Sequence, residues 1–175
     1  MKNRVLMVLV FAVALLSLAV GCGKKEENNN NETNNNNNNQ QPAVEEKKLE
    51  CSSSEKDSKT TEEFKFTYNY KGDNFDKVTV QSTTKFTSGK FDEKVYKEYG
   101  DECKEALEKT KKAGLTCNVQ ASGSSIWVTY QFTIADLNKE SKEYASKLDI
   151  DKYEGKKIDE VKSSLETNGL TCTIK

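Results

Sequence analysis

Phe64-Lys65-Phe66-Thr67-Tyr68-Asn69-Tyr70-Lys71-Gly72-Asp73-Asn74 is the stretch of sequence that decides the fold. Its aromatic residues alternate strictly with polar ones. Because successive side chains of a β-strand point to opposite faces, the stretch predicts a strand with one buried face. The residues from Lys71 to Asn74 have the composition of a turn. The alternation then resumes at every second position from Val78 to Phe86. We therefore expect a β-hairpin over residues 64–87.

A second hairpin is predicted further along the chain. Residues 115–121 read as a strand, the turn residues Ser122-Gly123-Ser124 follow, and apolar side chains then occupy every second position from Ile126 to Ile134. Trp127 falls on the opposite face of this strand. Two short strands complete the expected sheet. They are Leu49-Glu50-Cys51, followed by a polar loop through Thr61, and Leu170 to Ile174 at the end of the chain.

Three helices are predicted between and after these strands. From Phe91 the apolar residues fall four apart, as in an amphipathic helix: Phe91, Val95, Tyr99, Cys103 and Leu107. Gly100 within this helix indicates a kink or a break, and Gly114 fits its C-terminal cap. Asp136 is expected to cap a short helix over residues 137–148. A last helix, marked by Ile158, Val161 and Leu165, ends near Gly169.

These elements predict an α+β fold, in which an antiparallel sheet of five or six strands carries about three helices packed on one face. Strands joined by hairpins pair antiparallel, and such a sheet can keep its other face in water. The segment 47–175 contains roughly 130 residues, a common size for one domain. We therefore expect a single folded domain.

The N-terminal segment has the features of a signal peptide. Lys2 and Arg4 precede an almost wholly apolar run from Val5 to Val20, shorter than the roughly 20 residues of a membrane-spanning helix. Leu18-Ala19-Val20-Gly21-Cys22 resembles a bacterial lipobox, so residues 1–21 are predicted to be removed and Cys22 to be lipidated. The alternative, an uncleaved membrane helix, is disfavoured by the charged residues that follow Gly23. A diacylglyceryl group carries two acyl chains, enough to hold the protein on the outer face of the cytoplasmic membrane.

Residues 22–46 are predicted to form a tether between the lipid and the domain. Ten asparagines lie between Asn28 and Asn39, interrupted by Glu32 and Thr33. The tract has no apolar period, so burial cannot offset the entropy of ordering it. A flexible spacer is therefore expected.

The composition excludes several classes of function. Of the 27 basic residues, Lys2 and Arg4 lie in the predicted signal peptide, which leaves 25 against 28 acidic residues, a net charge of −3. This balance argues against a nucleic-acid partner. The absence of histidine removes the commonest general base and zinc ligand. We expect no catalytic residue, no metal site and no cofactor.

Four cysteines lie beyond the lipobox, and outside the cytoplasm an even number of cysteines indicates disulfides. We predict the pairs Cys103–Cys117 and Cys51–Cys172. The first pair lies on a helix and a strand that face the same layer, and the second lies in the first and last strands, where domain termini are often close. The rival pairing is Cys117–Cys172 with Cys51–Cys103, which requires the two strands that begin Gly-Leu-Thr-Cys to be neighbours. Four free thiols remain a further alternative.

The aromatic residues offer one candidate binding patch. Tyr68 and Tyr70 share the apolar face of their strand and are expected in the core. Trp127 has the polar strand neighbours Thr129 and Gln131, so we expect it to be partly exposed and able to mark a ligand-binding patch. The stretch from Asp149 to Glu160 superficially resembles a calcium loop. Tyr153 stands there where an oxygen ligand belongs, and we interpret the stretch as a turn before a helix.

The domain resembles the YehR-like family of small bacterial lipoproteins of uncharacterised function. The resemblance spans roughly residues 47–175 and depends on the order of its motifs. These are a cysteine-bearing first strand, the hairpin Phe66-Thr67-Tyr68-Asn69-Tyr70-Lys71-Gly72-Asp73, a Lys/Glu-rich helix ending in glycine, the strand Val128-Thr129-Tyr130, and the segment from Ile158 to Cys172. The resemblance implies an α+β fold and transfers no catalytic residue.

A second likeness is local. Gly155 to Val161, with Leu165 and Gly169-Leu170, is similar to the helix–strand half of a PASTA module, some of which bind cell-wall muropeptides. We therefore expect a membrane-anchored surface lipoprotein with a non-enzymatic binding or envelope-support domain, whose partner is an envelope component or a cell-wall ligand. The alternatives are an envelope enzyme that acts on cell-wall material through carboxylates, and an adhesin-type ligand-binding module.

Overall fold

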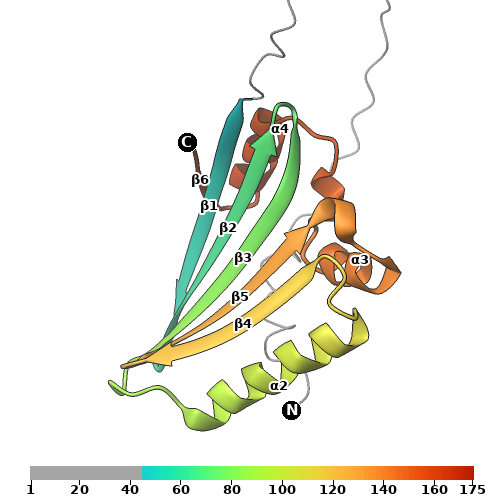
Figure 1. The fold of residues 1–175 in the computed structure, drawn as a ribbon. Coiled ribbons are helices and arrows are strands. Elements are labelled where there is room, and N and C mark those ends of the chain that lie inside the picture. Colours follow the sequence, from blue (N-terminus) through green and yellow to red (C-terminus); the bar gives the residue numbers. More distant parts are fainter. Residues whose placement is uncertain (1–44) are drawn as a thin grey trace, which may run out of the picture.

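Six strands form one antiparallel sheet in the order β4-β5-β3-β2-β1-β6. The computed structural model describes residues 45–175, and Figure 1 shows the sheet with its helices. The strands are β1 (Glu46–Lys56), β2 (Thr60–Lys71), β3 (Asn74–Phe86), β4 (Leu115–Ser122), β5 (Ser125–Thr133) and β6 (Thr171–Ile174). The helices are α2 (Glu93–Lys109), α3 (Lys139–Ser146) and α4 (Ile158–Thr167), with 3-10 turns η1 (Ile134–Asp136) and η2 (Asp151–Tyr153). The predicted α+β class is confirmed.

Both predicted hairpins are present and lie next to each other in the sheet. β2 pairs with β3, and β4 pairs with β5. Their turns contain Gly72 and Gly123, with φ of 63° and 59°, in the left-handed region that glycine adopts without steric cost. β3 and β5 pair with each other and so join the two hairpins into one sheet.

The first strand is longer than the sequence predicted. The polar loop expected from Ser52 to Thr61 is wrong, because residues 52–56 continue β1 and pair with β2 as far as Thr61. The chain reverses at Asp57, whose Oδ1 accepts hydrogen bonds from the backbone N–H groups of Lys59 and Thr60, each at 2.6 Å. Backbone pairing with a neighbouring strand does not require apolar side chains. The polar composition of residues 52–56 therefore gave no sign that the strand continues.

One face of the sheet packs against all three helices. The core joins sheet and helix residues, among them Leu49, Tyr68, Val78 and Phe132 from strands and Ala106, Ala145, Val161 and Leu165 from helices. In Figure 1, α2 runs along β4, and α4 lies behind β1 and β2. The helices therefore cover the face that carries the aromatic residues of β2.

The ends of α2 differ in part from the sequence prediction. Asp92 caps the N-terminus by accepting from the N–H groups of the second and third helical residues. The helix continues through Gly100 without a break. It ends in a Schellman pattern, in which Lys112 N–H donates to Leu107 O and Lys111 N–H to Glu108 O. Lys111, with φ of 51°, thus holds the left-handed position expected for Gly114, which instead leads into β4.

The cap predicted for α3 is also wrong. Asp136 lies in η1, and Asn138 caps the helix. The Asn138 side chain accepts from Ser141 N–H at 2.8 Å, while the Ser141 hydroxyl accepts from Asn138 N–H at 2.9 Å. This reciprocal capping box satisfies two backbone donors, whereas an aspartate two residues earlier satisfies neither.

Two disulfides tie the edges of the sheet to its interior. Cys51–Cys172 joins β1 to the edge strand β6, where the two residues face each other in register with Cα atoms 4.0 Å apart. Cys103–Cys117 joins α2 to the other edge strand, β4, with Cα atoms 5.6 Å apart. These are the two pairs that the sequence analysis favoured. The rival pairing fails because Cys117 and Cys172 lie on opposite edges of the six-stranded sheet.

Tyr68 supplies a prediction about the core. Its side chain is fully buried, and its hydroxyl has no hydrogen-bond partner within residues 45–175. Because an unpartnered buried hydroxyl costs about 1–3 kcal/mol of desolvation, Tyr68→Phe should raise the unfolding free energy by up to about 1 kcal/mol. Equilibrium unfolding in urea measures this change. Tyr70→Phe is the control, because the Tyr70 hydroxyl donates to Lys156 O at 3.4 Å; an equal gain in both variants would contradict the argument.

The predicted signal peptide, Cys22 and residues 22–44 of the predicted tether lie outside the described residues. β1 begins at Glu46, the last residue of the predicted tether. Within residues 45–175 no helix is long and apolar enough to cross a membrane.

Candidate binding surface

The face of the sheet opposite the helices is polar and contains one tryptophan. We call this surface the polar face and define it by sixteen residues that alternate with the buried ones along the strands. They are Thr116, Asn118, Gln120, Trp127, Thr129, Gln131, Thr79, Gln81, Thr83, Glu63, Lys65, Thr67, Glu50, Ser52, Thr171 and Thr173. None of them is buried, and only Glu50, Glu63 and Lys65 among them carry charge, although Lys48, Lys77 and Lys85 continue the same alternation toward the strand ends.

Trp127 lies within a row of polar side chains that crosses four strands. The register places Gln120 beside it on β4, Thr83 beside it on β3, and Glu63 next in the row on β2. Its side chain is partly exposed, on the face that the sequence predicted. Its role as a binding patch stays a prediction.

A hollow of about 390 Å³ lies beside this row. Its lining includes Ser52, Gln81, Thr83, Thr171 and Thr173 of the polar face. Thr83 therefore belongs to the wall of the hollow and is also the direct neighbour of Trp127. Because adjacent strands are about 4.8 Å apart, one extended ligand can touch the tryptophan and the hollow together.

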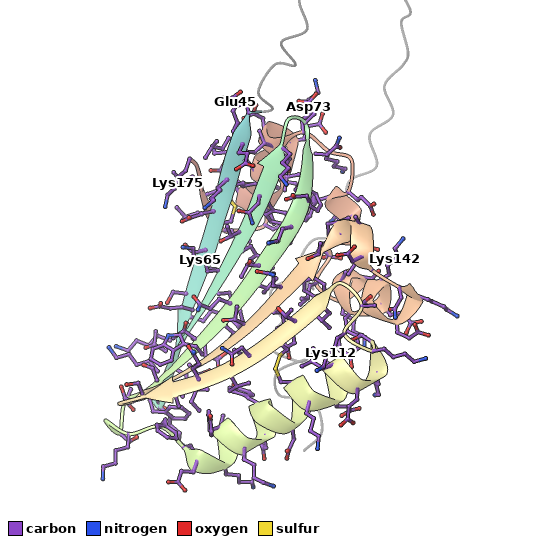
Figure 2. The ribbon with its side chains drawn as sticks, in the orientation of Figure 1. Glu45, Lys65, Asp73, Lys112, Lys142 and Lys175 are labelled. Carbon is purple, nitrogen blue, oxygen red and sulfur yellow. A yellow bond between two sulfur atoms is a disulfide. The ribbon has the colours of Figure 1, made fainter. Side chains whose placement is uncertain are left out.

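Glu50 organises the charged end of the hollow. Its Oε2 accepts from Lys175 Nζ at 2.8 Å and from Lys65 Nζ at 3.1 Å. Figure 2 marks Lys65 and Lys175 on the side of the sheet formed by β6, β1 and β2. The hydrogen bonds from Lys175 and Lys65 hold the pKa of the Glu50 carboxyl below its ordinary value. Glu50 thus pairs with both cations, and together with Glu63, which also lines the hollow, it balances their charge.

Most neutral groups of the polar face are open to an incoming ligand. Gln81 Nε2 donates to Thr129 Oγ1 at 3.4 Å. The side chains of Ser52, Thr83, Thr171 and Thr173 make no hydrogen bond within residues 45–175. A hydroxyl both donates and accepts, so these groups can pair with either kind of partner atom.

Two carboxyl groups on the helix side of the sheet were missed by the sequence analysis. Burial raises the pKa of Glu62 on β2, with further contributions from Asp57 and Glu55, and burial also raises the pKa of Glu102 on α2. Both lie near Tyr99, whose hydroxyl is 3.3 Å from Thr84 Oγ1. Glu62 occupies the same face of its strand as the core aromatics, two residues before the first of them. Because residues two apart in a strand lie on the same face, this spacing could have identified Glu62 as a residue of the helix side.

Tyr130 adjoins the same acidic region. Burial raises the pKa of its hydroxyl to about 12, and the nearby Glu102 adds to the shift. The hydroxyl therefore stays protonated at neutral pH and can act only as a neutral donor or acceptor.

Metal-binding groups do not converge in the part of the chain that the structure describes. Within residues 45–175 no group of three or more Cys, Asp or Glu side chains is placed to hold an ion. In the stretch that resembles a calcium loop, Tyr153 is buried in the core and makes an edge contact with Tyr68, with ring centroids 6.2 Å apart. That stretch therefore anchors the helix layer.

The fold is similar to two solved structures. A protein from Streptococcus pneumoniae TIGR4, solved by NMR, has 14% sequence identity and a TM-score of 0.54, over 89% of this chain and 100% of that one. The YehR protein of Escherichia coli, also solved by NMR, has 16% identity and a TM-score of 0.51, over 74% of this chain and 91% of that one. No family model and no curated protein sequence matches the chain. The chain thus has a YehR-like fold.

Proposed function

We propose that this chain is a lipid-anchored bacterial surface protein whose domain binds a hydroxyl-rich glycan of the cell wall, without catalysing a reaction. The observation that carries the proposal is the position of Trp127, a partly exposed aromatic residue of the polar face. It lies directly beside a hollow lined by hydroxyl and amide groups and by two acidic and two basic residues whose charges balance. The lipobox-like sequence ending at Cys22 supports the anchor.

The chemistry of the polar face matches that of a polysaccharide. Each sugar hydroxyl donates and accepts hydrogen bonds, as do the side chains of Ser52, Gln81, Thr83 and Thr171. The C–H face of a sugar ring is apolar and packs on a flat aromatic ring, for which Trp127 has the largest area. Around the hollow, Glu50 and Glu63 balance the charges of Lys65 and Lys175, which suits a neutral polymer better than a nucleic acid.

The predicted lipid anchor supports the same partner. A flexible tether of about 24 residues has a root-mean-square span of about 25–30 Å. A domain held at that distance from the outer surface of the membrane faces envelope material directly. An envelope-support role would use the same surface and the same anchor.

Binding to purified peptidoglycan tests the proposal. We expect Trp127→Ala to weaken binding of the mature protein at least about tenfold, because central aromatic anchors contribute most of the energy of an interface. Trp127→Phe should retain part of the affinity. Sedimentation of the protein with insoluble peptidoglycan measures both.

The matched control is Tyr96→Ala, which removes the exposed aromatic side chain of α2, away from the polar face. It should bind as the wild type does. If Trp127→Ala and Tyr96→Ala bind equally well while both remain folded by circular dichroism, the polar face is not the binding site.

The anchor is tested separately at Cys22. We expect Cys22→Ala to accumulate as an unprocessed precursor that lacks a diacylglyceryl group, because the thioether requires the cysteine sulfur. Mass spectrometry of the membrane fraction measures the modification. An unmodified Cys22 on an intact wild-type chain would exclude the lipoprotein assignment.

An envelope enzyme acting through carboxylates is the second candidate. The raised pKa of Glu62 and of Glu102 favours it, since a general acid binds its proton more tightly than an ordinary carboxyl does. Glu62→Gln and Glu102→Gln would then abolish release of soluble fragments from peptidoglycan. An adhesin-type module, the third candidate, would bind a ligand from outside the cell through the polar face and would not retain peptidoglycan.

A further inference from the structure

A groove of about 660 Å³ runs between α2 and the edge strand β4 and shares only Asn118 with the polar face. Its lining includes Tyr96, Gly100 and Leu107 from the helix, Val119 from the strand, and the disulfide between Cys103 and Cys117. Figure 1 shows α2 running beside β4 along the length of the strand. Three features of this groove point to the same kind of occupant.

The first feature is the unpaired backbone of β4. This strand pairs only with β5 among the described residues. Gly114 O accepts from Thr133 N at 2.8 Å, and in an antiparallel ladder the bonded positions alternate. Cys117 and Val119 therefore direct their N–H and C=O groups away from β5, along the edge that borders the groove. An extended chain can pair with such an edge as an added strand.

The second feature is Gly100. A glycine inside a helix costs about 1 kcal/mol relative to alanine, and helical backbone gives no reason for one. A Cβ atom at position 100 would meet nothing within 4 Å, so the fold itself does not require the glycine. Its missing side chain leaves space in the groove beside Tyr96, whose side chain is 38% exposed. A large apolar side chain of an added strand fits that space.

The third feature is the charge at the end of the groove. Along the helix, Lys97 pairs with Asp101 at 3.6 Å and Lys104 with Glu108 at 3.9 Å. Lys112 also lines the groove but makes no ion pair within residues 45–175. Figure 2 labels it where the chain leaves α2 toward β4. A carboxylate of a bound ligand would form an ion pair with Lys112 at this end of the groove.

We propose that the groove binds an extended peptide of a different protein, which adds to β4 as an antiparallel strand. A large apolar side chain occupies the space at Gly100, and an acidic side chain about four residues further on pairs with Lys112. The spacing follows because the helix rises about 14 Å from Gly100 to its end, and a strand covers that length in about four residues. The direction follows because Lys112 lies beside the start of β4.

The chain itself does not supply this occupant. The tether has no large apolar residue between Gly23 and Pro42. A second copy could offer its own β4, but that strand, from Leu115 to Ser122, contains no acidic residue to meet Lys112. The groove thus suits a partner with its own apolar and acidic residues, and this interaction is independent of glycan binding at the polar face.

The probe for a test is a fluorescent octapeptide of alternating threonine and valine, with one phenylalanine and, four residues later, one aspartate. Fluorescence anisotropy measures its binding to the mature protein. We expect Gly100→Leu to weaken binding at least tenfold, because the new side chain fills the space. Lys94→Leu adds the same side chain to the same helix outside the groove and should bind as the wild type does.

Two further comparisons separate backbone pairing from nonspecific hydrophobic binding of the peptide. A peptide N-methylated at the residues that face β4 keeps its side chains but loses its strand donors, and it should bind at least tenfold more weakly. Exchanging the peptide aspartate for asparagine should weaken binding to the wild type and leave binding to Lys112→Gln unchanged. Amide resonances of Cys117 and Val119 should shift on titration with the peptide.

Several outcomes would overturn the proposal. They are no binding at millimolar peptide, equal binding of the N-methylated peptide, an unchanged affinity in Gly100→Leu, or resonance shifts centred on Trp127. Self-association that Gly100→Leu abolishes, measured by light scattering, would identify a second copy as the occupant instead. Each variant is first compared with the wild type by circular dichroism, so that loss of fold is not mistaken for loss of binding.

Discussion

The double variant Cys51→Ala, Cys172→Ala should lose up to about 5 kcal/mol of unfolding free energy. The bridge joins residues 121 positions apart, and the entropy that a cross-link removes from the unfolded chain grows with the length of the closed loop. It also holds β6, a strand of four residues with β1 as its only neighbour in the described sheet. Equilibrium unfolding in urea measures the loss.

The second bridge provides the matched control. Cys103 and Cys117 are 14 positions apart, and the same relation gives about 3 kcal/mol for Cys103→Ala, Cys117→Ala. This pair also connects a helix that is otherwise packed against the sheet, so its local contacts survive reduction. If the two double variants lost equal stability, loop entropy would not be the main contribution of the long bridge.

Gly114→Ala should cost roughly 3–5 kcal/mol, although the same change at Gly169 should cost only about 1–2 kcal/mol. Both glycines begin a Gly-Leu-Thr-Cys segment after a helix, and both have positive φ, of 64° and 86°. At Gly114 an added Cβ would lie 2.8 Å from Thr133 O and from backbone atoms of Asp136 and Leu137. Those atoms belong to the backbone, so they cannot relieve the overlap by a side-chain rotation.

Gly169 and Gly100 are controls that separate the steric overlap at Gly114 from the strain of a left-handed backbone. At Gly169 an added Cβ meets nothing within 4 Å, so only the left-handed backbone is strained. At Gly100, with open space and helical backbone, alanine should raise stability by about 1 kcal/mol. Thermal and urea unfolding of Gly114→Ala, Gly169→Ala and Gly100→Ala rank the three variants by their change in unfolding free energy. A loss at Gly169 as large as that at Gly114 would show that backbone strain alone accounts for both.

The candidate sites differ in how far the sequence could reveal them. The face on which Trp127 lies follows from its odd position between Ile126 and Val128, because alternation along a strand is a local property. The hollow beside it was not predictable, since it combines residues of β1, β2, β3 and β6. Glu62 could have been placed on the helix side of the sheet from the sequence, because it lies two residues before Phe64 in the same strand. The raised pKa of Glu102, by contrast, depends on how deeply α2 buries it against the sheet.

By itself, the sequence determined that the class is α+β, which side chains of the alternating segments point toward the core, and where the strands and helices lie, except for the second half of β1. These properties depend on periods of two and of about four residues, which any short window of the chain contains. The caps were less certain, because Asp136 and Asn138 are both chemically able to cap α3, and only the capping box with Ser141 selects between them.

Only the tertiary structure decided the order of the strands, and much else depends on that order. It placed the two Gly-Leu-Thr-Cys strands at opposite edges, which excludes the rival disulfides, and it made β4 an edge whose backbone borders α2. It also brought the backbone of η1 against Gly114 and left the space beside Gly100 open. Strand order results from contacts between residues far apart in the chain, whose loop-closure and packing energies no local period encodes.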